Sequence, residues 1–248
     1  IKKGTPVVIG EANQETRPVF EAKALAEQAP IVFAEDEHLL KSDTHTPDGG
    51  FLYENEDYPQ LKGELGGMCQ EKNTNTLLSA LRILKKAGYN ISDNNVREGF
   101  AHVCELTGLQ GRWQKLQSEP TVICDTGHNI GGIQYIVKQL AQQNYKRLHI
   151  VMGMVNDKDI SGVLRLLPTD AIYYFTQASV KRALPAEKVQ ELAATDRLKG
   201  QCYPSVGIAV RAALENAEKD DLIFVGGSSF IVADLLSEKE NGSFSCKS

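Results

Sequence analysis

The feature that most constrains the fold is a regular alternation that begins after Pro120. Four apolar runs are separated by segments with helical periodicity. The runs are "TVIC" at 121–124, "RLHIVMGM" at 147–154, "AIYYFT" at 171–176 and "LIFVGG" at 222–227, and the helices are expected at 130–143, 159–167, 185–198, 206–217 and 228–237. Strands covered by helices on both faces read as continuous apolar runs. The pattern predicts a Rossmann-like α/β domain with a mainly parallel sheet over 119–248.

Residues 1–118 have a different pattern. "TPVVIGE" (5–11) and "PIVFAE" (30–35) are rich in β-branched residues and flank a segment with helical spacing, which predicts a strand, a helix and a strand. Residues 36–67 are polar and glycine-rich, and they are expected to form short strands and loops. Ser92 is the expected N-cap of a later helix, because its short side chain can accept an orphan backbone N–H. The two helices expected here cover 71–89 and 92–108.

Composition narrows the possible partners. The 248 residues include 27 Lys and Arg against 32 Asp and Glu, a formal net charge of −5, so the chain lacks the basic footprint of a protein that binds duplex nucleic acid. No apolar stretch approaches the roughly 20 residues that a membrane span needs, so no membrane partner is expected. The five cysteines form no CxxC pair and several lie in apolar runs. They are expected to be buried free thiols, which fits a cytoplasmic location.

The stretch "TVICDTGHNIGG" (121–132) carries the most informative polar residues. Asp125 directly follows an apolar run, and His128 and Asn129 come at the start of the next helical segment. In an open α/β sheet, ligands bind outside the carboxyl ends of the strands. A helix N-terminus suits phosphate or carboxylate, a carboxylate suits ribose hydroxyls, and an imidazole suits a phosphate oxygen. The alternative is that Asp125 or Asn129 caps the helix and His128 has no ligand.

Two further stretches carry side chains suited to a nucleotide. In "LQGRWQ" (109–114), Arg112 follows a glycine between elements, and arginine forks onto phosphate oxygens without losing its charge. In "CQEKNTNT" (69–76), Asn73 lies near a helix start. A side-chain amide can both donate a hydrogen bond to an adenine edge and accept one from it. The alternatives are a surface arginine and an N-cap asparagine.

Several other site types find no support. The remaining histidines fit no metal-ligand spacing, so no metal site is expected, and His149 lies inside an apolar strand as a core histidine would. Ser228 and Ser229 in "GGSSF" do not form the GxSxG turn of a nucleophilic serine. The chain contains no Walker A motif, GxxxxGK[ST], and no GxGxxG that follows a strand.

Taken in order, these stretches resemble one family. "IKKGTPVVIGE", "CQEKNTNT", "LQGRWQ", "CDTGHN", "GMVNDKD", "KRAL" and "GGSSFIVADLL" are similar to the carboxy-terminal part of folylpolyglutamate synthase/dihydrofolate synthase, in the Mur ligase superfamily. The resemblance runs from Ile1 to about Leu236. The family usually reads Asp-Gly-Ala-His-Asn-Pro where this chain has Asp-Thr-Gly-His-Asn-Ile. Ile130 is thus the main departure, and it loses the fixed backbone of a proline at a helix start.

The resemblance implies roles for individual residues. Asn73 would contact the adenine, Asp125 would hold the ribose, and Arg112 and His128 would reach the ATP phosphates as catalytic residues. The incoming glutamate would be bound in the carboxy-terminal domain, where the residues that match family motifs are Lys158, Asp159, Arg182 and Ser228.

The resemblance also implies a reaction and an incomplete site. In the family, ATP converts a substrate carboxylate to an acyl phosphate, which the amino group of L-glutamate attacks. The acceptor would be dihydropteroate, a reduced folate, or both. The P-loop, the Mg²⁺ ligands and a carbamylated lysine belong to a region that would lie upstream of Ile1. We therefore expect residues 1–118 to be the end of a P-loop-type ATP-binding domain and 119–248 to be a complete Rossmann-like domain. Such a fragment is expected to be monomeric, and inactive when alone.

Two alternatives stay open at this point. The chain could belong to another Mur-type ligase that adds an amino acid to a different carboxylate, because the acceptor-binding loops would lie upstream. It could also be a non-catalytic Rossmann-like module that binds a nucleotide or a partner. A dinucleotide oxidoreductase is disfavoured because its glycine fingerprint is missing.

Overall fold

The computed structural model describes residues 1–156 and 159–242. The chain divides into two compact units, Ile1–Gly108 and Leu109–Ser248. The sequence placed the boundary later, after residue 118. Residues 109–118 instead lie in the second unit, in whose sheet β6 (Gln114–Ser118) pairs with β7 (Thr121–Cys124).

The first unit begins with the predicted strand, helix and strand. β1 (Val7–Ile9) pairs in parallel with β2 (Ile31–Phe33), and α1 (Thr16–Ala26) connects them. The short helix α2 (Ala34–Glu37) leads into a three-stranded antiparallel sheet. Its strands are β3 (Leu40–His45), β4 (Phe51–Asn55) and β5 (Leu61–Gly63). The sheet and the helices that follow enclose a small apolar core, formed by Phe51, Tyr53, Tyr58, Leu61, Leu78 and Val96.

The helices of the first unit follow the sequence pattern with one difference. α3 (Gln70–Lys86) ends before Gly88, as predicted, and Ser92 caps α4 (Asp93–Ala101) by accepting the N–H of Asn95. The single helix expected over 92–108 is wrong, because the backbone turns out of helical geometry at His102 and α5 (Val103–Thr107) follows. Glu64 stabilises this break, since its carboxylate accepts the N–H of Cys104 at the start of α5.

The second unit is the predicted α/β domain. Its six-stranded sheet has the order β10–β9–β8–β11–β7–β6, with every pairing parallel except β6 with β7. The predicted inner strands are confirmed as β7, β8 (Leu148–Met152), β9 (Ile172–Phe175) and β11 (Leu222–Gly226). The two edge strands, β6 and β10 (Gly200–Cys202), were not predicted. Both are short or polar, as edge strands often are.

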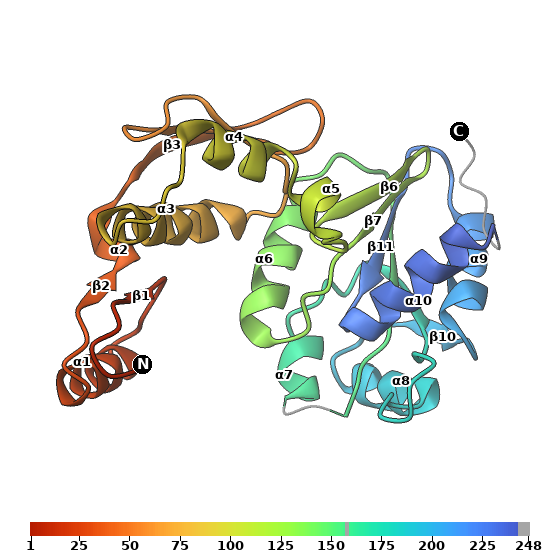
Figure 1. The fold of residues 1–248 in the computed structure, drawn as a ribbon. Coiled ribbons are helices and arrows are strands. Elements are labelled where there is room, and N and C mark those ends of the chain that lie inside the picture. Colours follow the sequence, from red (N-terminus) through yellow and green to blue (C-terminus); the bar gives the residue numbers. More distant parts are fainter. Residues whose placement is uncertain (157–158, 243–248) are drawn as a thin grey trace. The chain divides into compact units, whose positions relative to one another are not determined.

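Helices cover both faces of this sheet (Figure 1). On one face are α6 (Ile130–Leu140), α7 (Ile160–Leu164) and α8 (Ala186–Thr195), which bury residues such as Ile133, Leu164 and Val189. On the other are α9 (Val206–Asn216) and α10 (Ser229–Glu240), which bury residues such as Val210 and Ile231. Burial on both faces explains why the inner strands are apolar at most positions.

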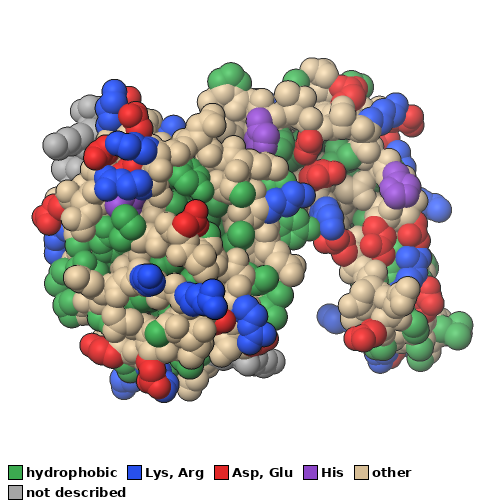
Figure 2. All heavy atoms as spheres, turned by 180° about the vertical axis from the view of Figure 1, so that it is seen from behind, with side chains coloured by type: hydrophobic (Ala, Val, Ile, Leu, Met, Phe, Trp, Pro, Cys, Tyr) green, Lys and Arg blue, Asp and Glu red, His purple; other side chains and the backbone are tan. Residues whose placement is uncertain are grey.

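The surface carries both signs of charge. On the face drawn in Figure 2, Lys and Arg side chains are interspersed with Asp and Glu over each unit. Among the described residues, no helix is both long and apolar enough to cross a membrane.

Candidate active site

The residues singled out in the second unit meet at one edge of its sheet. β7, β11 and β8 are parallel neighbours, and the loops at their carboxyl ends begin with Asp125, Gly227 and Gly153. The backbone joins these ends, because Asp125 N–H donates to Val225 O at 3.2 Å and Gly153 N–H donates to Gly226 O at 3.4 Å. This is the edge at which open α/β sheets bind ligands.

The loop after β7 is organised by two side chains. Asn129 caps α6, since its Oδ1 accepts the N–H of Gly132 at 2.8 Å. Asp125 does not cap that helix; one of its oxygens instead accepts the N–H of Gly127 at 2.7 Å within the loop. His128 is exposed, and its Nδ1 lies 3.0 Å from Thr126 O. A carbonyl oxygen only accepts, so Nδ1 donates and Nε2 is the ring nitrogen left for a ligand.

The loop that carries Arg112 is joined to this one. Trp113 N–H donates to the second Asp125 oxygen at 2.7 Å, and Thr126 N–H donates to Gly111 O at 2.9 Å. Arg112 itself is exposed. Burial raises the pKa of Asp125, and the N–H groups of Gly127 and Trp113 and the charge of Arg112 oppose that rise. The structure thus brings Arg112, Asp125 and His128, three of the residues assigned to ATP, to one place.

Three other stretches form a second cluster at the same edge. The strand-like bridge between Val155 and Ala183 joins the loop after β8 to the loop after β9, and Asn156 N–H donates to Arg182 O at 3.2 Å. The Arg182 guanidinium lies over the ring of Phe230, 4.6 Å from its centroid. The stretches "GMVN", "KRAL" and "GGSSF" are therefore in contact, as a shared glutamate site would need.

The predicted glutamate-side residues differ in what they offer a ligand. Arg182 is exposed, whereas Ser228 is buried and caps α10 by accepting the N–H of Phe230 at 3.2 Å. Asp159 is exposed and caps α7, with its Oδ1 2.8 Å from the N–H of Gly162. Lys158 lies outside the described residues.

Asn73 lies in the first unit and is exposed. It is not the N-cap of α3, because Cys69 holds that position and Asn73 lies within the helix. Its amide donates to Gln70 Oε1 at 3.1 Å. The helix-cap alternative is therefore wrong for Asn73, and its contact with adenine stays a prediction.

Two residues of this edge were missed by sequence reasoning. Phe230 was quoted only as part of a glycine-rich turn, yet its ring supports the guanidinium of Arg182. Trp113 was quoted only as the neighbour of Arg112, yet its backbone N–H joins the two loops. The position of Trp113 beside Arg112 was an available signal, whereas Phe230 lies far from Arg182 in the chain and the sequence offered no signal for their contact.

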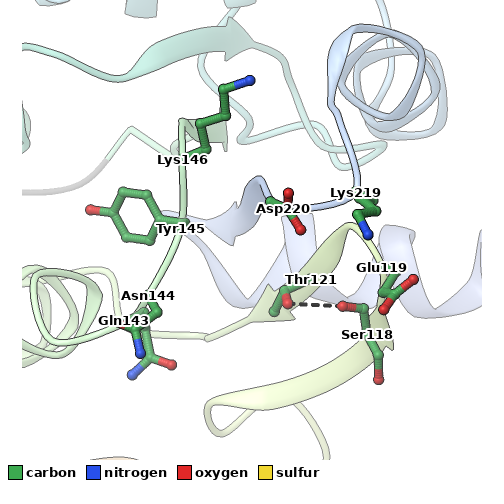
Figure 3. Close-up of a pocket in the computed structure, with 9 residues that line it drawn as sticks. All are labelled: Ser118, Glu119, Thr121, Gln143, Asn144, Tyr145, Lys146, Lys219 and Asp220. Atoms are coloured by element: carbon green, nitrogen blue, oxygen red, sulfur yellow. Dashed lines mark hydrogen bonds between the residues drawn. The ribbon is translucent and has the colours of Figure 1, made fainter.

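A large hollow of the second unit lies at the opposite edge of the sheet. It has a volume of about 620 Å³ and is lined by polar residues that precede β7, β8 and β11, among them Tyr145, Lys146 and Asp220. Figure 3 shows these side chains spread around an open depression, with one hydrogen bond among them, from Thr121 Oγ1 to Ser118 O. None of the predicted site residues lines it.

A metal ion held by the chain itself would need several ligating side chains close together. Across residues 1–156 and 159–242, no group of three or more His, Cys, Asp and Glu is arranged to hold a metal ion.

The chain is similar to proteins of known sequence and structure. Residues 111–229 match the family described as "Mur ligase, glutamate ligase domain". The dihydrofolate synthase/folylpolyglutamate synthase of Escherichia coli (strain K12) is 32% identical over 171 residues, which cover 68% of this chain and 38% of that protein. The folylpolyglutamate synthase of Lacticaseibacillus casei is 25% identical over 239 residues, which cover 94% of this chain and 54% of that protein. The chain thus spans about half the length of such relatives, or less.

A solved structure shows the same fold. E. coli FolC in complex with DHPP and ADP superposes with a TM-score of 0.77 at 24% identity, over 98% of this chain and 55% of that one. The Rossmann-like sheet and the joined loops at its carboxyl edge define a Mur-ligase-type carboxy-terminal domain. The second unit therefore carries a Mur ligase glutamate ligase domain, and the chain is similar to the carboxy-terminal portion of folylpolyglutamate synthase/dihydrofolate synthase proteins.

Proposed function

We propose that the chain forms the glutamate-adding part of an ATP-dependent ligase that joins L-glutamate to dihydropteroate, to reduced folates, or to both. The observation that carries this proposal is that two clusters lie at one edge of the sheet. One is formed by the turn before β6, which carries Arg112, and the loop after β7, which carries Asp125. The other is formed by Arg182 after β9 and Phe230 after β11. One cluster suits a nucleotide and the other suits an anionic amino acid.

The nucleotide cluster offers charge and donors to phosphate. The exposed Arg112 guanidinium can fork onto phosphate oxygens, and His128 in its imidazolium form can donate to them through Nε2–H while Nδ1–H donates to Thr126 O. Asp125 keeps acceptor capacity for a ribose hydroxyl, because a carboxylate has about four lone-pair sites and two are used here. Asn73 of the first unit is proposed to contact the adenine.

The second cluster offers a site for the glutamate carboxylates. Phe230 holds the Arg182 guanidinium in a stacked position, from which its N–H groups can bind a carboxylate in a bidentate manner. Ser228 contributes by fixing the start of α10, since its hydroxyl is buried in the cap. Lys158 and Asp159 are proposed to lie near the same ligand.

The proposed reaction has two steps. A carboxylate oxygen of the acceptor attacks the γ-phosphorus of ATP and ADP leaves, which gives an acyl phosphate. The glutamate amino group then attacks the acyl carbon, loses a proton, and phosphate leaves as the amide forms. Arg112 and His128 would stabilise the charge that moves between the phosphates, so catalysis is mainly positioning and electrostatics. Magnesium, proposed to be bound by residues upstream, would supply further charge neutralisation.

The chain alone is proposed to lack ligase activity. Its sequence contains no GxxxxGK[ST] motif, so the cradle that such a motif forms for phosphates is missing from these residues. We expect ATP to bind the chain more weakly than micromolar in isothermal titration. Binding at micromolar affinity or better would contradict this part of the proposal. The monomeric state and cytoplasmic location stay predictions from the sequence.

The test is product formation by the chain joined to its upstream segment. Labelled L-glutamate, ATP and magnesium would be supplied with either dihydropteroate or tetrahydrofolate, and the amide product would be separated and counted. Arg112→Ala should abolish incorporation, whereas Arg165→Ala, which removes an exposed arginine ion-paired with Asp196, should retain it. Folded protein that incorporates glutamate into neither acceptor would refute the folate assignment and favour another Mur-type ligase.

A further inference from the structure

The backbone around Arg112 has an unusual conformation. Gly111 has φ = +72° and Trp113 has φ = +48°, so two of three consecutive residues are in the left-handed region. Trp113 is not a glycine, and such a conformation persists in a non-glycine residue only when its surroundings enforce it. The surroundings of Trp113 must therefore enforce its positive φ.

Four hydrogen bonds fix this turn. Asp125 Oδ2 accepts from Trp113 N–H at 2.7 Å, and Gly111 O accepts from Thr126 N–H at 2.9 Å. Gly111 N–H donates to Gln114 Oε1 at 2.8 Å. The fourth bond, from Gly127 N–H to Asp125 Oδ1 at 2.7 Å, fixes the carboxylate itself. Asp125 is therefore the side-chain link between the Arg112 turn and the loop that carries His128, beside the backbone bond from Thr126.

Packing leaves the turn little room to move. A Cβ at Gly111 would lie 2.7 Å from Val232 Cγ1 and 2.9 Å from Thr126 Cγ2. The Trp113 ring is partly buried against the core, with its centroid 6.3 Å from that of Phe224 on β11. Arg112 alone points its side chain to solvent from this fixed turn.

We propose that Asp125 is a positioning residue for Arg112: its carboxylate fastens the turn 111–113 to the β7–α6 loop, so that the guanidinium is presented from a rigid part of the second unit. This goes beyond the ribose contact assigned to Asp125. The identity of the anion that Arg112 meets rests on the proposed function, but the fastening does not.

The chain contains its own reporter for this proposal, because Trp113 is its only tryptophan. Asp125→Asn keeps the side-chain size but replaces one accepting oxygen by an NH₂ group, which cannot accept either backbone N–H. The turn should loosen, which should shift the Trp113 emission to longer wavelength and increase its quenching by acrylamide about twofold. Circular dichroism would verify that the variant is folded.

Asn129→Ala is the matched control. It removes a hydrogen bond of similar length from the same loop, the 2.8 Å bond that Asn129 Oδ1 accepts from Gly132 N–H. That bond does not involve the turn 111–113. Its Trp113 emission and quenching should match those of the unmodified chain. Emission and quenching of folded Asp125→Asn that equal those of the control would overturn the proposal.

A measurement on the unmodified chain covers the case in which Asp125→Asn does not fold. The Trp113 amide precedes β6 and donates its hydrogen bond to the Asp125 carboxylate, so its hydrogen exchange reports the fastening directly. We expect strong protection in amide exchange measured by NMR. Exchange at the rate of an unprotected loop amide would contradict the proposal.

ATP binding supplies a functional readout. In the chain with its upstream segment, Asp125→Asn should weaken ATP binding, measured by isothermal titration, more in the unmodified background than in the Arg112→Ala background, because part of its effect passes through Arg112. Equal losses in both backgrounds would show that Asp125 does not act through Arg112. If the unmodified protein has no ligase activity, the proposed function fails while the fluorescence and exchange results still decide the fastening.

Discussion

Replacing Asp221 by asparagine tests the account of how the second unit is held together. Asp221 lies just before β11 and is 1% exposed, and His149 in β8 is 0% exposed. The carboxylate lies 3.2 Å from His149 Nε2, and the other ring nitrogen lies 3.0 Å from the hydroxyl of Tyr174. His149 is thus the satisfied core histidine that the sequence predicted.

The magnitude follows from the bonds that asparagine cannot replace. Asp221 Oδ2 accepts from Glu218 N–H at 2.8 Å and from Arg147 Nη2 at 2.8 Å, and Oδ1 accepts from Arg147 N–H at 3.0 Å. An amide has one accepting oxygen, so at least one buried donor loses its partner and Arg147 loses its counter-charge. We expect a loss of about 3 kcal/mol in the free energy of unfolding. For a domain of this size, that corresponds to a fall in Tm of about 6 to 12 °C.

The effect should depend on pH in a defined direction. Burial alone raises the pKa of Asp221, but the Glu218 N–H, the Arg147 guanidinium and His149 outweigh it and lower the pKa from 3.8 to about 2. A depressed carboxyl pKa stabilises the fold above pH 3.8, and this contribution is lost as the pH falls toward 2. The difference between Asp221→Asn and the unmodified chain should therefore shrink over that interval. Burial lowers the pKa of His149, so the unmodified chain should also lose stability as the pH falls below 6.5.

The assay is urea unfolding followed by Trp113 emission, which reports on the second unit alone because Trp113 lies within it. Asp220→Asn is the control, since it removes the same charge from an adjacent exposed side chain. Equal stability of the two variants at neutral pH would refute the reasoning.

Three further predictions concern other parts of the chain. Gly227→Ala should cost about 3 kcal/mol or more of unfolding free energy in a thermal melt, because φ is +91° and a Cβ would lie 2.2 Å from Met152 Sδ; an unchanged melt would contradict the geometry. Ser92→Ala should cost about 1 kcal/mol, visible as faster amide exchange in α4; unaltered exchange would show that the cap is dispensable. Arg182→Lys should raise the KM for glutamate about tenfold at unchanged Tm, because lysine cannot form a planar fork stacked on Phe230; an unaltered KM would remove Arg182 from the site.

The sequence predicted the inner part of the second unit well, for a physical reason. β7 and β11 are covered on both faces, and such strands are apolar at nearly every position, which makes them visible as runs. β6 and β10 escaped prediction because edge strands need only a partial apolar pattern. The break at His102 escaped because it depends on Glu64, which is distant in sequence.

The candidate site could be predicted in its residue types but not in its connections. Asp125 and Asn129 were both possible helix caps by sequence, and only the structure shows that Asn129 is the cap while Asp125 binds the Trp113 N–H. The stacking of Arg182 on Phe230 likewise joins two loops that are far apart in the chain. Tertiary contacts of this kind leave no periodic signal in a single sequence.

The central claim is that the chain carries the glutamate-adding domain of an ATP-dependent ligase. The most direct measurement is phosphate release from ATP by the chain joined to its upstream segment, with dihydropteroate or tetrahydrofolate present, and with or without L-glutamate. The account predicts release that requires both glutamate and one of the pterins and that collapses in Arg112→Ala. Release that is indifferent to glutamate, or that survives in Arg112→Ala, would contradict it.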